Sequence, residues 1–570
     1  MTKRWWHDKI AYQIYPKSFY DSNGDGIGDL GGIISKLDYL KDLGIDMIWL
    51  SPIYESPFVD QGYDISDYYK IAECFGTMEE FDTLLAETKK RNMYVIMDLV
   101  VNHCSDKHKW FQEALKDPKS EYRDYFYFVK GKNGQPPSNY RSYFGGSAWE
   151  PVKGEKDMYY LHMFAKEQPD LNWENPKVRE QIYRMINWWL NKGLAGFRID
   201  AIINIKKDLE FRSFEPDGED GLAACTKMVD SVTGVGDFLK EMSAVTFEPK
   251  DAFTVGEVFN MKKEELEAFI GENGYFSSIF DFSAHLLTLG EHGWYDAKPL
   301  EFKTWRQTIF SSQLEADGLG FKSNIIENHD EPRGVSTFLP DYARNEDGKK
   351  MLATTSLLLR GIPFIYQGQE IGMTNCKRGD IREYDDINTH DQYQVALDAG
   401  LKKEQALQVC YDHSRDNART PMQWRATKHA GFTTGIPWLS VNANYFAVNV
   451  EKQEKRPDSL LNYYRELIAL RKFPAYKDLL VYGHFVPAFM NYDYIFAYYR
   501  ALEDTSVQIL VIANYGQETE TLPLGNMLVE KVLLMNTNFK EDIRREARSE
   551  CQVTLHSCEA VVLLVSEVKL

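Results

Sequence analysis

Short apolar runs of strand length recur through the first two thirds of the chain. Eight runs bounded by turn-forming residues span 10–16, 45–52, 94–100, 196–200, 252–258, 277–282, 322–328 and 363–368. Their nearly continuous hydrophobicity is typical of strands that are covered on both faces. Amphipathic helical patterns lie between them, as at 32–43, 78–91 and 175–193. This alternation predicts an α/β fold, a (β/α)8 TIM barrel.

Two connections are too long for simple loops and divide the chain further. Residues 104–174, after the third strand, are expected to form an inserted domain over the barrel mouth, and a subdomain is expected at about 370–455. The barrel itself takes 1–103 and 175–480. After a helical pattern at 458–472, period-two alternation predicts a C-terminal antiparallel β domain over 481–570.

Polar residues follow several of the predicted strands at the ends where barrel enzymes carry their reacting groups. These strand-end residues are Asp98, Asn102, His103, Arg198, Asp200, Glu257, Asn328, His329 and Asp330. One acidic residue in a strand is more often an ion pair or a turn cap. Four acidic strand ends in register instead predict carboxylates that meet at one mouth.

Two carboxyl groups on adjacent strands fit the needs of glycoside hydrolysis. A retaining enzyme needs a nucleophilic carboxylate and a protonated carboxyl about 5 Å apart, and Asp200 and Glu257 can meet that spacing. Arg198 points to the same face of its strand as Asp200 and can keep it ionised. His103 and His329 can donate to sugar hydroxyls, and Asp330 can stabilise the positive transition state.

The blocks DLVVNH (98–103), QPDLN (168–172), GFRIDA (196–201), TVGEV (254–258) and ENHDEPR (327–333) resemble the ordered signature of the α-amylase family. Residues 13–30, 62–65, 361–373 and 414–424 extend the resemblance to its oligo-1,6-glucosidase and α-glucosidase subgroup. The resemblance implies a retaining, exo-acting α-glucosidase. In that enzyme Asp200 forms the glucosyl-enzyme, Glu257 is the acid/base and Asp330 stabilises the distorted sugar.

The same resemblance implies a set of substrate-binding residues. The terminal glucose would be surrounded by Tyr63, His103, Arg198 and His329. Its non-reducing end would be closed, or the next sugar unit bound, by Asp60 and either Arg333 or Arg415. The block from Phe164 to Gln168 would lie beside them. Ala201 stands where α-1,6-specific members carry Val. The linkage preference therefore stays open between isomalto- and malto-oligosaccharides.

The loop DSNGDGIGD offers oxygen ligands on every second residue. They are Asp21, Asn23, Asp25, the Ile27 carbonyl and Asp29, with Gly26 at the sixth position as in an EF-hand loop. Gly32 replaces the twelfth-position Glu, which argues against a regulatory switch. The resemblance favours a structural Ca2+, and the alternative is a turn without metal. No organic cofactor is expected.

The amino-acid composition limits the classes of molecule that the protein is expected to bind. A net charge of −19 disfavours nucleic acid and anionic membranes and favours a neutral small oligosaccharide. The seven cysteines are scattered without zinc-site spacing, and no apolar run has the length of a signal or membrane segment, so we expect a cytoplasmic protein. We also expect it to be a monomer or a weak homodimer.

Two other functions remain open from the residues. A sucrose isomerase or other glucosyltransferase would share the glucosyl-enzyme, but 280–298 lacks the arginine-rich cluster of sucrose isomerases. A non-catalytic binding relative, such as the heavy subunits of amino-acid transporters, would need a membrane span and could lose its carboxylates.

Overall fold

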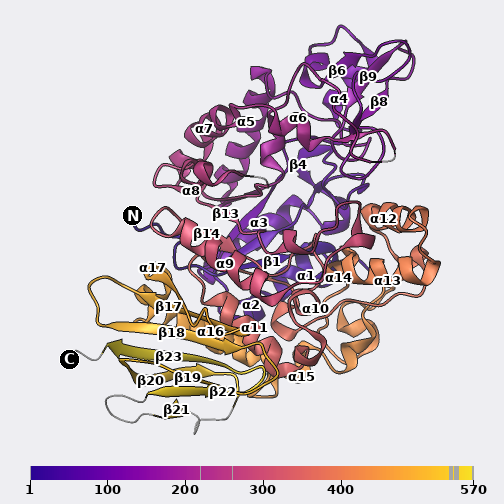
Figure 1. Ribbon diagram of the computed structural model, residues 1–570. Helices are drawn as coiled ribbons and strands as arrows, with labels where there is room; N and C mark the ends of the chain where they lie inside the picture. Colours follow the sequence, from indigo (N-terminus) through magenta and orange to yellow (C-terminus); the bar gives the residue numbers. More distant parts are fainter. Residues whose placement is uncertain (1, 219, 260, 538–542, 545–550, 568–570) are drawn as a thin grey trace.

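The eight predicted strands close into a parallel barrel in the computed structural model, which describes residues 2–218, 220–259, 261–537, 543–544 and 551–567 (Figure 1). Around the barrel lie β1 (Ala11–Ile14), β2 (Met47–Leu50), β5 (Tyr94–Leu99), β10 (Gly196–Ile199), β12 (Phe253–Gly256), β13 (Ser278–Phe280), β14 (Lys322–Asn324) and β15 (Ile362–Tyr366). Strands that follow one another in this series are neighbours, and β15 returns to β1. The predicted fold class is confirmed.

Strand register brings the acidic strand ends together. Arg198 on β10 stands opposite Asp98 on β5 and Val255 on β12. The ladder continues past the strands, because Asp200 donates its N–H to Leu99 O (3.0 Å) and Glu257 donates to Ile199 O (2.9 Å). The pairing of three neighbouring strands therefore places their carboxylates at one edge of the barrel.

Helices between the strands start and stop where the sequence provides caps. In α5 (Pro176–Lys192), the Asn175 side chain accepts from Lys177 N, Pro176 occupies the first turn, and Gly193 ends the helix at φ 116°. The expected helix over 32–43 is instead two helices, α1 (Leu30–Ser35) and α2 (Leu37–Leu43), because Lys36 leaves helical geometry at φ −107°, ψ 4°. In the described ranges, no helix has the length and apolar character needed to cross a membrane.

The insertion after β5 forms a small unit at one end of the barrel (Figure 1). It contains α4 (Lys109–Lys116) and a sheet in the order β6 (Phe128–Lys130), β9 (Met158–Leu161), β8 (Trp149–Pro151). A further strand, β7 (Tyr140–Arg141), pairs with β11 (Ala223–Ala224), which follows β10 in the chain. Cys225 and Met228 pack with Trp149 and Leu161. The core of this unit therefore extends beyond residues 104–174 and includes residues of the loop after β10.

The last part of the chain forms antiparallel sheets on the far side of the barrel from the insertion (Figure 1). One sheet has the order β16 (His484–Ala488), β17 (Ile495–Ala501), β18 (Val507–Asn514), β23 (Ala560–Glu567), β20 (Met527–Met535), and a smaller one has the order β19 (Glu520–Pro523), β22 (Gln552–Leu555), β21 (Ile543–Arg544). Helix α16 (Leu460–Lys472) precedes them, and α12 (Ile387–Asp398), α13 (Lys403–His413) and α14 (Asp416–Arg419) occupy the expected subdomain.

Candidate active site

A pocket of about 520 Å³ opens at the carboxyl ends of the barrel strands. Nine residues expected from the sequence line it: Asp60, Tyr63, His103, Phe164, Asp200, Ala201, Glu257, Asp330 and Arg415. They come from seven separate parts of the chain, which the barrel brings to one mouth. The position agrees with the rule that barrel enzymes react at this end.

One buried guanidinium joins the carboxylates at the base of this pocket. Arg198, with 1% of its surface exposed, contacts Asp200 Oδ1 through Nη1 (2.5 Å) and Glu257 Oε1 through Nη2 (2.8 Å). The same Nη1 lies 2.7 Å from Asp98 Oδ1. Glu257 Oε2 also accepts the N–H of Ala201 at 2.9 Å. Asp200 and Glu257 are therefore held on one planar group with a fixed mutual orientation.

Burial governs the charge of these two carboxyls. It raises the pKa of Asp200 to about 7 and that of Glu257 to about 7, with the Arg198 charge opposing the rise in both. A pair of carboxyls near neutrality can keep one proton at physiological pH. That state contains both an acid and a carboxylate.

Asp330 is in the opposite electrostatic state. Burial acts to raise its pKa, but His329, Arg415 and Arg419 outweigh that effect and hold the pKa of Asp330 well below its usual range. The contacts are 2.9 Å from His329 Nε2, 3.2 Å from Arg415 Nη1 and 2.9 Å from Arg419 Nη2. Asp330 therefore stays ionised. Arg419 lies in the 414–424 block, but nothing in its spacing marked it as a separate site residue.

A network of side-chain contacts joins the residues of the pocket wall around Asp60, Tyr63 and His103. The Tyr63 ring stacks on the His329 ring with centroids 5.4 Å apart and planes 9° apart. Gln168 Nε2 bridges Asp60 Oδ2 (3.1 Å) and His103 Nε2 (3.2 Å). Gln168, Arg198 and His329 do not line the pocket themselves, but each contacts residues that do.

Arg415 and Arg333, which the sequence left as alternatives, lie in different places. Arg415 Nη2 reaches Asp60 Oδ1 at 3.3 Å and lies in the pocket wall. Arg333 is fully buried outside the lining, where Nη1 contacts Glu327 Oε1 (3.3 Å) and donates to Gln367 O (2.7 Å). Its donors are directed to protein acceptors, so of the two alternatives the structure brings Arg415, and not Arg333, to the pocket wall.

Eleven further lining residues were not identified from the sequence. They are Tyr143, Phe144, Ile203, Asn204, Thr226, Val229, Asp230, Phe259, Leu286, Leu289 and Asn388. Most lie in the loops after β10, β12 and β13, where no motif marks them. Leu286 and Leu289 are 47% and 54% exposed, so the outer wall of the pocket presents apolar surface.

The proposed calcium loop is closed by its own hydrogen bonds. Asp21 accepts from Gly24 N (2.7 Å), from Gly26 N (2.8 Å) and from the Thr433 hydroxyl, and Asp29 caps α1 through Gly32 N (2.6 Å). The donor set is all oxygen, which suits a hard cation. Within the described ranges, however, no group of three or more His, Cys, Asp or Glu side chains has an arrangement that could hold a metal. Calcium therefore remains a prediction.

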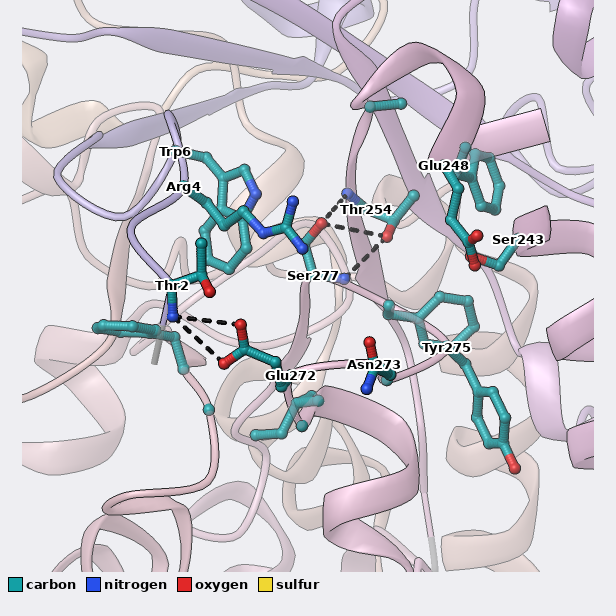
Figure 2. A pocket seen from close by; sticks show the side chains of 18 of the residues that line it. Thr2, Arg4, Trp6, Ser243, Glu248, Thr254, Glu272, Asn273, Tyr275 and Ser277 are labelled. Carbon is teal, nitrogen blue, oxygen red and sulfur yellow. Dashed lines mark hydrogen bonds between the residues drawn. The ribbon is translucent and has the colours of Figure 1, made fainter.

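A second pocket of about 360 Å³ lies at the opposite, amino-terminal ends of the strands (Figure 2). Its polar groups are largely paired with one another. Glu272 accepts from Thr2 N (3.2 Å), and Ser277 exchanges hydrogen bonds with Thr254 (3.0 and 3.1 Å), as Figure 2 shows. None of the predicted site residues lies in its lining. The catalytic candidate is therefore the pocket at the other end.

A (β/α)8 barrel with paired carboxylates in a pocket at the carboxyl ends of its strands is the arrangement expected of a glycoside hydrolase. The sequence model of the family described as "Alpha amylase, catalytic domain" matches residues 13–483, so the chain belongs to the α-amylase family. It is 42% identical to an oligo-1,6-glucosidase of Parageobacillus thermoglucosidasius over 99% of both chains. It is 46% identical to one of Bacillus cereus over 91% of this chain and 92% of the relative.

A solved structure is similar over the whole fold. An isomaltulose synthase from Klebsiella sp. LX3 matches with a TM-score of 0.92 and 38% identity, covering 99% of this chain and 100% of that one. The family and the enzyme class expected from the sequence are confirmed.

Proposed function

We propose that the protein is a retaining, exo-acting α-glucosidase that releases glucose from the non-reducing end of short isomalto- or malto-oligosaccharides. The observation that carries this proposal is the single Arg198 guanidinium, which contacts both Asp200 and Glu257 at the base of a pocket. That arrangement supplies a nucleophile and an acid side by side, as retaining hydrolysis requires.

In the first step, an Asp200 carboxylate oxygen attacks the anomeric carbon as its bond to the glycosidic oxygen breaks. Glu257 gives its proton to that oxygen, and the shortened saccharide leaves. In the second step, Glu257 removes a proton from water, whose oxygen attacks the anomeric carbon and releases Asp200. The ionised Asp330 stabilises the positive charge that develops on the sugar.

The closed end of the pocket supports exo action. Arg415 joins Asp60 to Asp330 and is itself held by Asp386 at 2.5 Å. These contacts cross the pocket end, where a continuing glucan chain would have to pass. Phe144 and Phe164, from the insertion after β5, complete the wall. We infer that this wall leaves room for one glucose unit beyond the carboxylates.

The charges of the lining favour an uncharged substrate. Among the described residues of the lining, carboxyl groups belong to Asp60, Asp200, Asp230, Glu257 and Asp330, and the only Lys or Arg is Arg415. Arg198 and Arg419 contact these carboxylates from outside the lining and offset part of their charge. Arg415 is itself paired with three Asp side chains, so the lining offers little attraction to an anionic group such as phosphate, and a neutral oligosaccharide needs none.

A second candidate is glucosyl transfer to a sugar, as in an isomaltulose synthase. It is favoured by the apolar outer wall, where Phe259 stacks on Phe282 (centroids 5.0 Å apart) near Leu286 and Leu289. Such a wall can hold the apolar face of an acceptor sugar and exclude water. Against it, residues 280–298 contain no arginine cluster.

Product analysis decides between the two. We expect glucose from isomaltose or maltose, and glucose with fructose from sucrose. Proton NMR taken at early times should show the α-anomer of glucose first, because retention passes through two inversions. The β-anomer would exclude retention, and sucrose isomers as the main product would establish transfer.

We propose further that a structural calcium ion is bound by Asp21, Asn23, Asp25, Ile27 O and Asp29. The alternating oxygen donors support this, and the loop is tied to residues 433–436 through Thr433, so an ion there would stabilise that junction. Elemental analysis and melting before and after chelation test it. Unchanged metal content and melting temperature would exclude calcium.

We also propose a reducing, cytoplasmic location and a monomer or weak homodimer. Cys104, Cys225, Cys376 and Cys410 are buried free thiols, which suits a reducing compartment. Cell fractionation tests the location, and sedimentation tests the oligomeric state.

A further inference from the structure

Asp64 is a buried carboxylate that the proposed mechanism does not use. It lies in the loop between β3 (Tyr54–Glu55) and β4 (Asp67–Ile71), which also carries Asp60 and Tyr63 to the catalytic pocket. The residue is 0% exposed, and it does not line the pocket. Burying a carboxylate costs free energy unless hydrogen-bond donors satisfy it, so the donors around Asp64 indicate what this residue does in the structure.

The two oxygens of Asp64 bind the loop to itself. Oδ1 accepts from the Ser56 hydroxyl at 3.0 Å and from the Asp60 N–H at 3.1 Å. Oδ2 accepts from the Val59 N–H at 2.9 Å. All three donors belong to the loop, so this one side chain fixes the path of the backbone between Ser56 and Asp60.

The loop needs such an anchor because its backbone is strained. Phe58 has φ 61° and Gln61 has φ 50°, both in the left-handed region that is unfavourable for residues with a Cβ atom. A hydrogen bond from Tyr63 N to Asp60 O (3.0 Å) closes the turn that follows. Without the Asp64 contacts, the chain would relax toward commoner backbone angles.

The anchored loop presents two groups that face the sugar. Asp60 is oriented by Gln168 (3.1 Å) and Arg415 (3.3 Å), and the Tyr63 ring stacks on His329. We infer that Asp64 is a positioning residue, which fixes the loop so that Asp60 and Tyr63 meet the terminal glucose. This inference rests on the proposed function.

The test compares Asp64→Asn with wild type. The new amide nitrogen faces an N–H or O–H donor, so at least one of the three bonds is lost. We expect KM for isomaltose and the inhibition constant of glucose to rise together by about tenfold, with a smaller change in kcat. The matched control is Asp67→Asn on β4, whose Oδ1 accepts from Tyr69 N (2.9 Å) outside the loop. It should leave both constants unchanged.

A folded Asp64→Asn enzyme with wild-type KM and glucose inhibition would overturn the inference. A fall in kcat alone, with a lower melting temperature, would show a purely structural role and would also overturn it. If this variant does not fold, Ser56→Ala decides, because it removes one donor and should raise both constants about threefold. A wild-type protein that releases no glucose would refute the proposed function instead. Calorimetric binding of glucose to both proteins would then still test Asp64.

Discussion

Arg198→Lys tests whether one guanidinium sets the charge of both reacting carboxyls. Arg198 reaches Asp200 and Glu257 through separate nitrogens, whereas a lysine keeps the charge on a single nitrogen. Losing one buried charge-assisted contact and distorting the other should cost about 2 to 4 kcal/mol. That range corresponds to a fall in kcat/KM of roughly 30- to 1,000-fold.

The same change should move the pH dependence in a known direction. Burial already raises the pKa of Asp200 to about 7 and that of Glu257 to about 7, and Arg198 opposes the rise. With weaker opposition both pKa values increase. Because the attacking carboxyl must be ionised, the acid limb of kcat/KM should shift to higher pH in the variant.

The assay is hydrolysis of 4-nitrophenyl α-glucoside across the pH range in which the wild type stays folded, with thermal melting to verify the fold. Arg184→Lys is the matched control, because Arg184 is a surface residue paired with Glu180 (2.6 Å). Surface pairs contribute little, so this control should keep wild-type activity. The reasoning fails if folded Arg198→Lys stays within about threefold of wild type with an unmoved acid limb.

Three further predictions follow from the same pocket. Asp200→Asn should abolish hydrolysis. Burial raises the pKa of Asp200 in the folded state above its unfolded value, so the wild type loses stability as pH rises through about 4 to 7, and the variant does not. The melting temperature of the variant should therefore exceed that of the wild type at neutral pH and equal it in acid; a difference that stays constant with pH would contradict this. Ala201→Val should reduce the rate of maltose hydrolysis relative to that of isomaltose by about tenfold. It should also lower the melting temperature, because Ala201 has left-handed backbone angles (φ 41°, ψ 37°) that disfavour a branched side chain. An unchanged ratio of the two rates would show that Ala201 does not determine the linkage preference. A long α-glucan should lose glucose slowly without a fall in viscosity, whereas a rapid fall in viscosity would mean an open cleft.

Residues at strand ends could be predicted from the sequence because the barrel repeats one simple pattern. Asp98, Asp200 and Glu257 each end an apolar run, and parallel register then fixes where they meet. The outer wall follows no such pattern. Ile203, Val229 and Leu286 lie on short helices in the long connections after β10 and β13, where an apolar side chain can face the core or the pocket, and tertiary packing alone decides which.

The partners of three arginine side chains could not be predicted from the sequence either. Arg333, Arg415 and Arg419 all lie within the family blocks at 327–333 and 414–424, and each has a long side chain with many rotamers. Glu327 and three carbonyl groups bind Arg333 in the interior, while Asp60 and Asp330 bind Arg415 at the pocket. Spacing along the chain carries no information about which partner each guanidinium meets.

Opposed electrostatic environments give the three central carboxyls different roles in one pocket. Asp200 and Glu257 share one guanidinium, and burial keeps both near the point where a proton can be held or released. Asp330 meets two guanidiniums and His329, so it is charged whatever the state of the other two. Proton transfer therefore belongs to the pair on Arg198, and Asp330 is left with electrostatic stabilisation of the sugar cation. Glu257 must give up its proton and later take one back, so it cannot be permanently ionised, whereas Asp330, which contacts Arg415, Arg419 and His329, can be.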